Sequence, residues 1–442
     1  MKKIVTAIAV IVLLWSCSNK PVQQTYFSDP FWYSKTVKEL NEVVKFVGFP
    51  PIVASRNYAY ANIAAYECIA AGFPNEYQSL GGQLNGFKMP DLGGFKDRKI
   101  DYEFASLLAF CKVGEAVTFP EGSMKNYVDS MKTFAKDQGM PSEMYDNSLQ
   151  FADTVAKSVL AWSKKDNYAQ TRSASRYNVI DTPGRWVPTP PAYASALEPH
   201  WNEIRTMVMD SASQFTPPPP MPFNMTDKNS GYYKQVIAVK NAVDSLTDEQ
   251  KHIAEFWDDL GGKLNVTGHV MFVTKKFSPP GHWMNIVGIA AQKAKAGFHK
   301  TVAAYTLTGI CMFDSFIQCW DEKFRHNTVR PETVINKYLD QEWRPYLQTP
   351  PFPEYTCGHS TVSSASAEAL TKMFGDNFNY TDSSELEFGI ANRSFTSFRQ
   401  AAEENNAARF YGGIHFHPSC IVSTEYGRKV GDMIVGKLKM EK

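Results

Sequence analysis

The sequence lacks an excess of charge of either sign. Its 442 residues include 46 Lys and Arg against 45 Asp and Glu, a net charge of +1. This balance gives no bulk attraction for nucleic acid or an anionic membrane surface, so any anion site must be a local cluster of basic residues. The apolar fraction of 43% and the charged fraction of 21% are ordinary for a globular protein. They exclude a disordered chain, a collagen-like fibre and a protein with many membrane spans.

Cysteine is also scarce. Seven cysteines in a chain of this length do not make a disulfide framework. No Cys-x-x-Cys pair is present, which argues against a structural zinc site. Cys311 and Cys319 lie in one predicted helix, more than two turns apart, so we do not expect them to pair.

The N-terminus predicts export and a lipid anchor. Basic residues precede an apolar run over 4–14 that is too short to span a bilayer. The Leu-Trp-Ser-Cys sequence that ends at Cys17 resembles the cleavage box of bacterial lipoproteins. The resemblance implies a signal peptide over 1–16, lipidation of Cys17 and, because Ser18 rather than Asp follows, a place at the outer membrane facing the periplasm. The alternative is a plain secretory signal with an unmodified cysteine.

Helix signals dominate the rest of the chain. Good helix formers occur with apolar residues three or four positions apart, and alternating apolar runs are scarce, so we predict an all-α fold. The clearest segments are 59–71, 147–164, 248–259, 282–297, 301–324 and 363–374. A proline-rich stretch over 209–230 is either a boundary between two helical halves or a rigid loop within one domain.

Two basic residues near position 330 are spaced to share one face of a helix. Lys323 and Arg330 are two helical turns apart, and Pro331 limits continuation of the helix. Such a pair suits a tetrahedral oxyanion, because Arg offers paired planar donors and Lys a point charge. The alternative is a solvated basic stripe.

A second motif follows a proline-rich loop. Cys357, Gly358 and His359 precede a predicted helix, whose first N–H groups and positive dipole end favour an anion. Gly358 allows close approach of the backbone to a ligand, and His359 lies beside it. The alternative is a turn with an exposed histidine.

A third motif joins Arg409 to His415 across a pair of glycines. We expect the neighbouring His417 to be a surface residue. For His282, in a Pro-Pro-Gly-His-Trp segment outside the motifs, we expect a structural role, with a place in the pocket wall as the alternative.

Taken in order, the three motifs resemble the signature of the superfamily of type 2 phosphatidic acid phosphatases (PAP2) and vanadium-dependent haloperoxidases. Segments 56–60, 279–283 and 319–323 are also similar to bacterial haloperoxidase-like lipoproteins. The resemblance implies an all-α helical-bundle domain of the PAP2/haloperoxidase type with additional N-terminal helices. We therefore divide the chain into the signal peptide 1–16, an N-terminal helical region 17–215 and a C-terminal domain 216–442 that carries the oxyanion site.

The resemblance also implies the role of each motif residue. His415 would ligate vanadium, or attack phosphorus in a phosphatase, and His359 would be the acid and base. The oxygens of vanadate or phosphate would be bound by Lys323, Arg330, Cys357, Gly358 and Arg409.

Two positions depart from the family pattern. Cys357 stands where Ser is usual, and a thiol is a poor hydrogen-bond donor that peroxide can oxidise. Ser419 stands where an Asp often orients the second histidine, so His415 needs another partner for its second ring nitrogen.

Three functions are compatible with these residues. The first is a vanadate-dependent haloperoxidase that oxidises halide with hydrogen peroxide. The second is an acid phosphatase that uses the same pocket without a metal, on a phosphate ester, with His415 as the nucleophile. The third is a glycan-binding outer-membrane lipoprotein, whose aromatic residues, 13% of the chain, would stack on sugars. In each case we expect small-molecule ligands, no nucleic acid, and membrane contact through the lipid anchor only, and the oligomeric state stays open.

Overall fold

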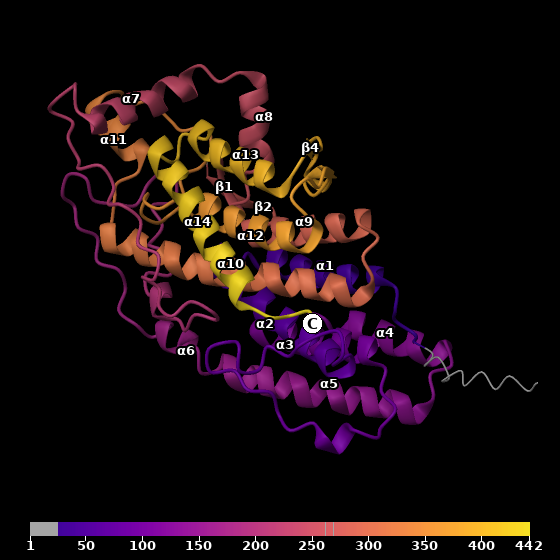
Figure 1. Ribbon diagram of the computed structural model, residues 1–442. Coiled ribbons are helices and arrows are strands. Elements are labelled where there is room, and N and C mark those ends of the chain that lie inside the picture. Colours follow the sequence, from indigo (N-terminus) through magenta and orange to yellow (C-terminus); the bar gives the residue numbers. More distant parts are fainter. Residues whose placement is uncertain (1–24, 261, 268) are drawn as a thin grey trace, which may run out of the picture.

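The computed structural model describes residues 25–260, 262–267 and 269–442. These residues form fourteen α-helices and two short antiparallel hairpins (Figure 1), which confirms the all-α prediction. Cys17 and the predicted signal peptide lie outside the described residues.

The helices are α1 (Pro30–Val47), α2 (Pro51–Gly72), α3 (Tyr102–Val117), α4 (Lys125–Asp137), α5 (Ser142–Ser163), α6 (Tyr168–Thr171), α7 (Gly231–Asp244), α8 (Asp248–Phe256), α9 (Pro279–Lys293), α10 (Phe298–His326), α11 (Pro331–Tyr338), α12 (Gly358–Phe374), α13 (Phe398–Tyr411) and α14 (His417–Lys437). The hairpins pair β1 (Gly262–Thr267) with β2 (Val270–Lys275) and β3 (Tyr380–Asp382) with β4 (Arg393–Phe395).

Helix α10 is the centre of the fold. It is buried on every side along most of its length, and α2, α9, α12 and α14 pack against it. The helix is long and apolar enough to cross a membrane, but its most apolar window is 100% buried inside the protein, as in the core helix of a globular protein.

One core cluster joins the early and late parts of the chain. It contains buried residues of α2, α3 and α5, which form the lower part of Figure 1, and of α10, α12 and α14, drawn in orange and yellow. The segment 209–230 contains no helix among its described residues. The boundary between 17–215 and 216–442 stays a prediction.

Each predicted helix corresponds to an observed one, and the ends differ by a few residues. The largest difference is in α2, which begins at Pro51 rather than at 59. Helix α12 begins at Gly358 rather than at 363. Helix α12 has Cys357 as its N-cap, but Gly358 and the polar residues after it lack the apolar spacing that would predict a helix from the sequence.

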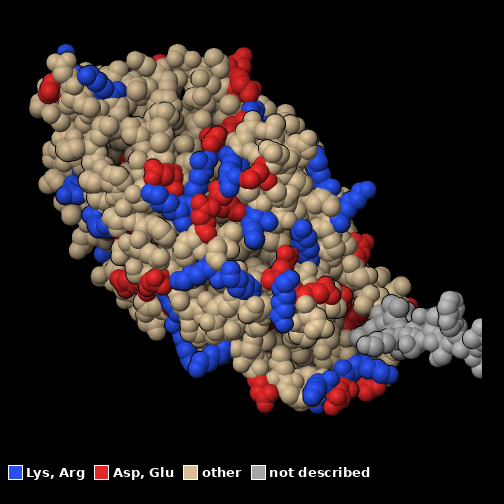
Figure 2. Space-filling model, viewed as in Figure 1, with Lys and Arg blue, Asp and Glu red and all other residues tan. Residues whose placement is uncertain are grey.

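On the face shown in Figure 2, Lys and Arg are interspersed with Asp and Glu, in keeping with the balanced net charge.

Candidate active site

Lys323 and Arg330 come together, but not on one face of a helix. Helix α10 ends at His326, because Asn327 adopts a left-handed conformation with φ of 51° at the C-cap. Arg330 is extended and is the N-cap of α11. The prediction of a shared helix face is therefore wrong, and the turn between the two helices brings the side chains together. Lys323 Nζ and Arg330 Cζ lie 5.0 Å and 5.1 Å from the centroid of the Phe352 ring.

The buried ammonium of Lys323 is held by the loop that precedes α12. It donates hydrogen bonds to the carbonyl oxygens of Pro353 at 2.9 Å and Glu354 at 3.1 Å, and to that of Thr356. Burial lowers the pKa of Lys323 to about 8. The lysine is therefore a cation near neutral pH, and its burial in the charged form costs the protein stability.

The guanidinium of Arg330 joins this loop to the third motif. Its Nε donates to the carbonyl oxygen of Phe352 at 2.9 Å, and its Nη1 donates to that of Ile414 at 2.8 Å. The same Nη1 lies 3.0 Å from His415 Nε2. Burial lowers the pKa of Arg330 to about 10, so it stays charged at neutral pH.

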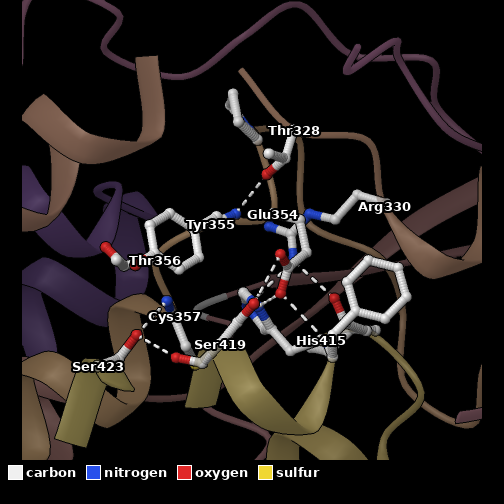
Figure 3. A network of polar contacts seen from close by, with 12 residues as sticks. Thr328, Arg330, Glu354, Tyr355, Thr356, Cys357, His415, Ser419 and Ser423 are labelled. Carbon is white, nitrogen blue, oxygen red and sulfur yellow. Dashed lines mark hydrogen bonds and ion pairs between the residues drawn. The ribbon is translucent and has the colours of Figure 1, made fainter. Parts of the chain in front are cut away.

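Glu354 supplies the partner that His415 needs (Figure 3). Its Oε1 lies 2.9 Å from His415 Nδ1 and accepts from the backbone N–H of Phe416 at 3.1 Å, and its Oε2 accepts from Ser419 Oγ at 3.0 Å. Arg330 can only donate, so His415 Nε2 is an acceptor and Nδ1 carries the proton that points at Glu354. Ser419, at the position where Asp was expected, orients this carboxylate instead of the histidine.

Sequence reasoning missed Glu354. The available signal was an acidic side chain within an otherwise uncharged, proline-rich loop, four residues before Gly358. Its partner His415 lies 61 positions further on, so the local pattern does not identify the pair.

His359 lies in the first turn of α12. Burial lowers the pKa of His359 well below its ordinary value, and the positive charge of Arg409 lowers it further. The imidazole is therefore neutral at neutral pH and able to accept a proton. Its Nε2 is buried without a hydrogen-bond partner in the described part of the chain.

Arg409 reaches the site from the last turn of α13. One of its Nη atoms donates to the carbonyl oxygen of Trp257, and its Nε has no partner among the described residues. A small cavity is lined by residues of the second and third motifs, Gly358, His359, Arg409 and His415, and by Trp320.

The unpartnered atoms around His415 indicate what the site would hold. Buried donors without an acceptor are costly, and two guanidinium atoms here, Arg330 Nη2 and Arg409 Nε, have none among the described residues. An oxyanion would supply acceptors to both, so the residues fit vanadate or phosphate.

Cys357 completes the set. Its backbone N–H donates to Ser423 Oγ at 2.8 Å (Figure 3). Its Sγ lies within 4.8 Å of a ring nitrogen of His415. The structure thus brings together all the predicted site residues that it describes: Lys323, Arg330, Cys357, Gly358, His359, Arg409 and His415. Their catalytic roles stay predictions. His417 is exposed, as expected, and His282 is buried and absent from the cavity wall.

Comparison with known proteins places this geometry in a family. A family model described as the VCPO second helical-bundle domain matches residues 303–441. A crystal structure named as the first bacterial vanadium-dependent iodoperoxidase is 42% identical, covers 93% of this chain and 97% of its own, and has a TM-score of 0.86.

Two structures of bacterial vanadium-dependent chloroperoxidase, a holo form and an apo form, are 18% identical to the chain and show the same fold. Their TM-scores are 0.63 and 0.65, over 88% of this chain and 92% and 94% of theirs. No curated protein matches the chain. Identity of 42% over almost the whole of both chains, with the three motifs brought into contact around His415, shows that the chain belongs to the family of vanadium-dependent haloperoxidases.

Proposed function

We propose that the chain oxidises halide, with iodide as the preferred ion, using hydrogen peroxide and vanadate bound at His415. The observation that carries the proposal is the pair of buried, unpartnered guanidinium atoms of Arg330 and Arg409 around this histidine. The iodide preference is supported by the name of the relative with 42% identity, an iodoperoxidase.

Charge favours an anion at this place. Lys323, Arg330 and Arg409 bring three cationic groups to the site, and Glu354 is the acid that contacts His415. The three cations and the N–H of Gly358 would hold the oxygens of vanadate, and His415 Nε2 would be the ligand to vanadium. When bound, vanadate supplies Lewis-acid activation of peroxide.

The two histidines have different tasks. The Nδ1–H of His415 donates to Glu354, so Nε2 is the unprotonated nitrogen. Arg330 Nη1 contacts this nitrogen at 3.0 Å, and vanadium would take the place of that contact. His359 is neutral and would take the proton that hydrogen peroxide loses on binding. Glu354 is a positioning residue, since it acts through His415.

We also propose that Cys17 anchors the enzyme to the bacterial envelope, at the outer membrane facing the periplasm. The support is the lipoprotein-like segment that ends at this cysteine. A Cys17→Ser variant should move from the membrane fraction to the soluble fraction of the cells. A variant that stays with the membranes would contradict lipidation.

Vanadate binding to the full chain is the test of the catalytic proposal. We expect calorimetry to show binding that His415→Ala abolishes and that His417→Ala, a matched change of an exposed neighbour, leaves intact. Peroxide and iodide should then give triiodide, with turnover that depends on vanadate. Phosphate release from an aryl phosphate, inhibited by vanadate and without halide oxidation, would overturn the proposal in favour of a phosphatase.

A further inference from the structure

Two thiols meet beside the candidate active site. Cys357 is the N-cap of α12, Cys420 lies near the start of α14, and both are 0% exposed. Their Sγ atoms and a ring nitrogen of His415 all lie within 4.8 Å of one another.

Hydrogen bonds hold the backbone around Cys357 and Cys420 together. Cys357 N–H donates to Ser423 Oγ at 2.8 Å, and Ser423 Oγ donates to the carbonyl oxygen of Ser419 at 2.6 Å (Figure 3). The start of α12 is therefore fixed against the turn of α14 that carries Cys420. The two sulfurs lie within 4.8 Å of each other and must approach to about 2.05 Å, by rotation of the side chains, to form a bond.

The other described cysteines are placed differently. Cys68, Cys111 and Cys311 are buried in the core, away from the cavity wall. Cys319 lies nearer to the start of α12, beside Gly358, but its Sγ accepts a hydrogen bond from Thr356 Oγ1 at 3.3 Å.

A metal cation is a poor occupant of the Cys357, His415 and Cys420 cluster. Thiolates and imidazole would suit zinc by ligand type. However, Arg330 Nη1 lies 3.0 Å from His415 Nε2, and the buried ammonium of Lys323 adds a second positive charge. The electrostatics of the site favour anions over a divalent cation.

We propose that Cys357 and Cys420 form an oxidative modification site, at which hydrogen peroxide converts the two thiols into a reversible disulfide. The oxidant is the substrate of the proposed function, and on this point the inference rests on that function. The bond would protect Cys357, which directly precedes Gly358 of the proposed vanadate site, from irreversible oxidation.

The chemistry balances with one molecule of peroxide. The sulfur of Cys357 attacks one peroxide oxygen, the O–O bond breaks, and a sulfenic acid and water result. The sulfur of Cys420 then attacks the sulfenic sulfur, forms the S–S bond and releases a second water. The two thiols lose two electrons and two protons, and peroxide is reduced to two waters.

The experiment treats the reduced full chain with hydrogen peroxide in the absence of vanadate and halide. We expect a loss of two thiols, a mass lower by about 2 Da, and a peptide that links position 357 to position 420, all reversed by dithiothreitol. A link from Cys357 to Cys319, a sulfinic or sulfonic Cys357 beside a free Cys420, or two intact thiols at peroxide concentrations that support turnover would each overturn the proposal.

Matched variants sharpen the result. Cys420→Ser removes the second thiol, so peroxide should add about 32 or 48 Da to Cys357 irreversibly. Cys319→Ser should keep the link between 357 and 420. If a variant fails to fold, the peptide map of the oxidised chain without substitutions still shows whether positions 357 and 420 are linked. Thiol pairing without iodide oxidation would contradict only the proposed function, and iodide oxidation with both thiols free would contradict only the disulfide.

Discussion

His415 and His282 are both buried, and both contact carboxylates, yet their surroundings differ. His282 Nδ1 lies 3.0 Å from Asp259 and its Nε2 lies 2.9 Å from Asp382. Its ring stacks on Trp257 with centroids 4.8 Å apart. His415 has one carboxylate, Glu354, and its other nitrogen faces a cation.

The two clusters differ in charge balance. Burial opposes protonation of His282, but Asp259 and Asp382 overcome it and raise its pKa well above the ordinary value. Lys276 pairs with the nearby Glu385 at 2.9 Å, and around His282 the three carboxylates of Asp259, Asp382 and Glu385 outnumber the two cationic groups. At the candidate active site, cations exceed acids, and guanidinium donors lack partners among the described residues. Unpartnered donors and an excess of positive charge, rather than burial, distinguish the candidate anion site from the acid-rich cluster around His282.

The largest effect we expect is on activity, from His415→Ala. Loss of the ligand to vanadium should reduce vanadate-dependent iodide oxidation by at least about 10³-fold. The free energy of unfolding should fall by no more than about 2 kcal/mol, because Glu354 keeps its hydrogen bonds from Phe416 N–H and Ser419 Oγ. Steady-state kinetics and denaturant unfolding measure the two quantities. Activity above a tenth of the original would contradict the role of His415.

The reverse pattern is expected for His282→Ala. Removing the imidazolium leaves two buried carboxylates without their partner, which should lower the free energy of unfolding by about 3–5 kcal/mol. Vanadate affinity of the folded protein should change by less than about tenfold, since His282 lies outside the cavity wall. Denaturant unfolding and calorimetry test this contrast. An unchanged stability would show that the charges around His282 do not need it.

The same contrast explains what the sequence could and could not predict. The cationic and imidazole residues of the site are recognisable because their chemistry and spacing lie within short motifs, such as Gly358-His359. Glu354 and Asp382 are not, because each meets its histidine through a pairing 61 and 100 positions apart that only packing creates. The turn after α10 was predictable in principle, since Asn at a helix end favours the left-handed conformation that Asn327 adopts.

Glu354→Gln tests the least expected feature of the site. The amide keeps the size of the side chain but loses the charge that holds the Nδ1 proton of His415, so we expect vanadate affinity or kcat to fall by about 10–100-fold. A merely structural role would leave the pH profile unchanged, whereas loss of the carboxylate should shift the acid limb of kcat/KM. Ser419→Ala, which removes one hydrogen bond to Glu354, should have the same sign and a smaller size.

The smallest effect we expect is a gain in the free energy of unfolding from Lys323→Met, opposite in sign to the loss expected from His282→Ala. The pKa of Lys323 is about 8 in the folded protein, and that of an unfolded lysine is about 10.4. Between these values the unfolded chain binds more protons, so the stability of the ligand-free protein rises with pH, and the cost of burying the ammonium is fully present below pH 8.

Lys323→Met removes that cost and leaves three carbonyl acceptors without their donor, so we expect a net stabilisation of about 1 kcal/mol at pH 7. The gain should shrink as the pH rises above 8, and vanadate binding should be lost at every pH. Unfolding measured at pH 7 and pH 9.5, with and without vanadate, tests both statements. If the protein buries the Lys323 ammonium at a cost in stability for the sake of the ligand, removing the ammonium must recover that stability. A variant less stable than the original at pH 7 would therefore mean that Lys323 stabilises the fold, as His282 does.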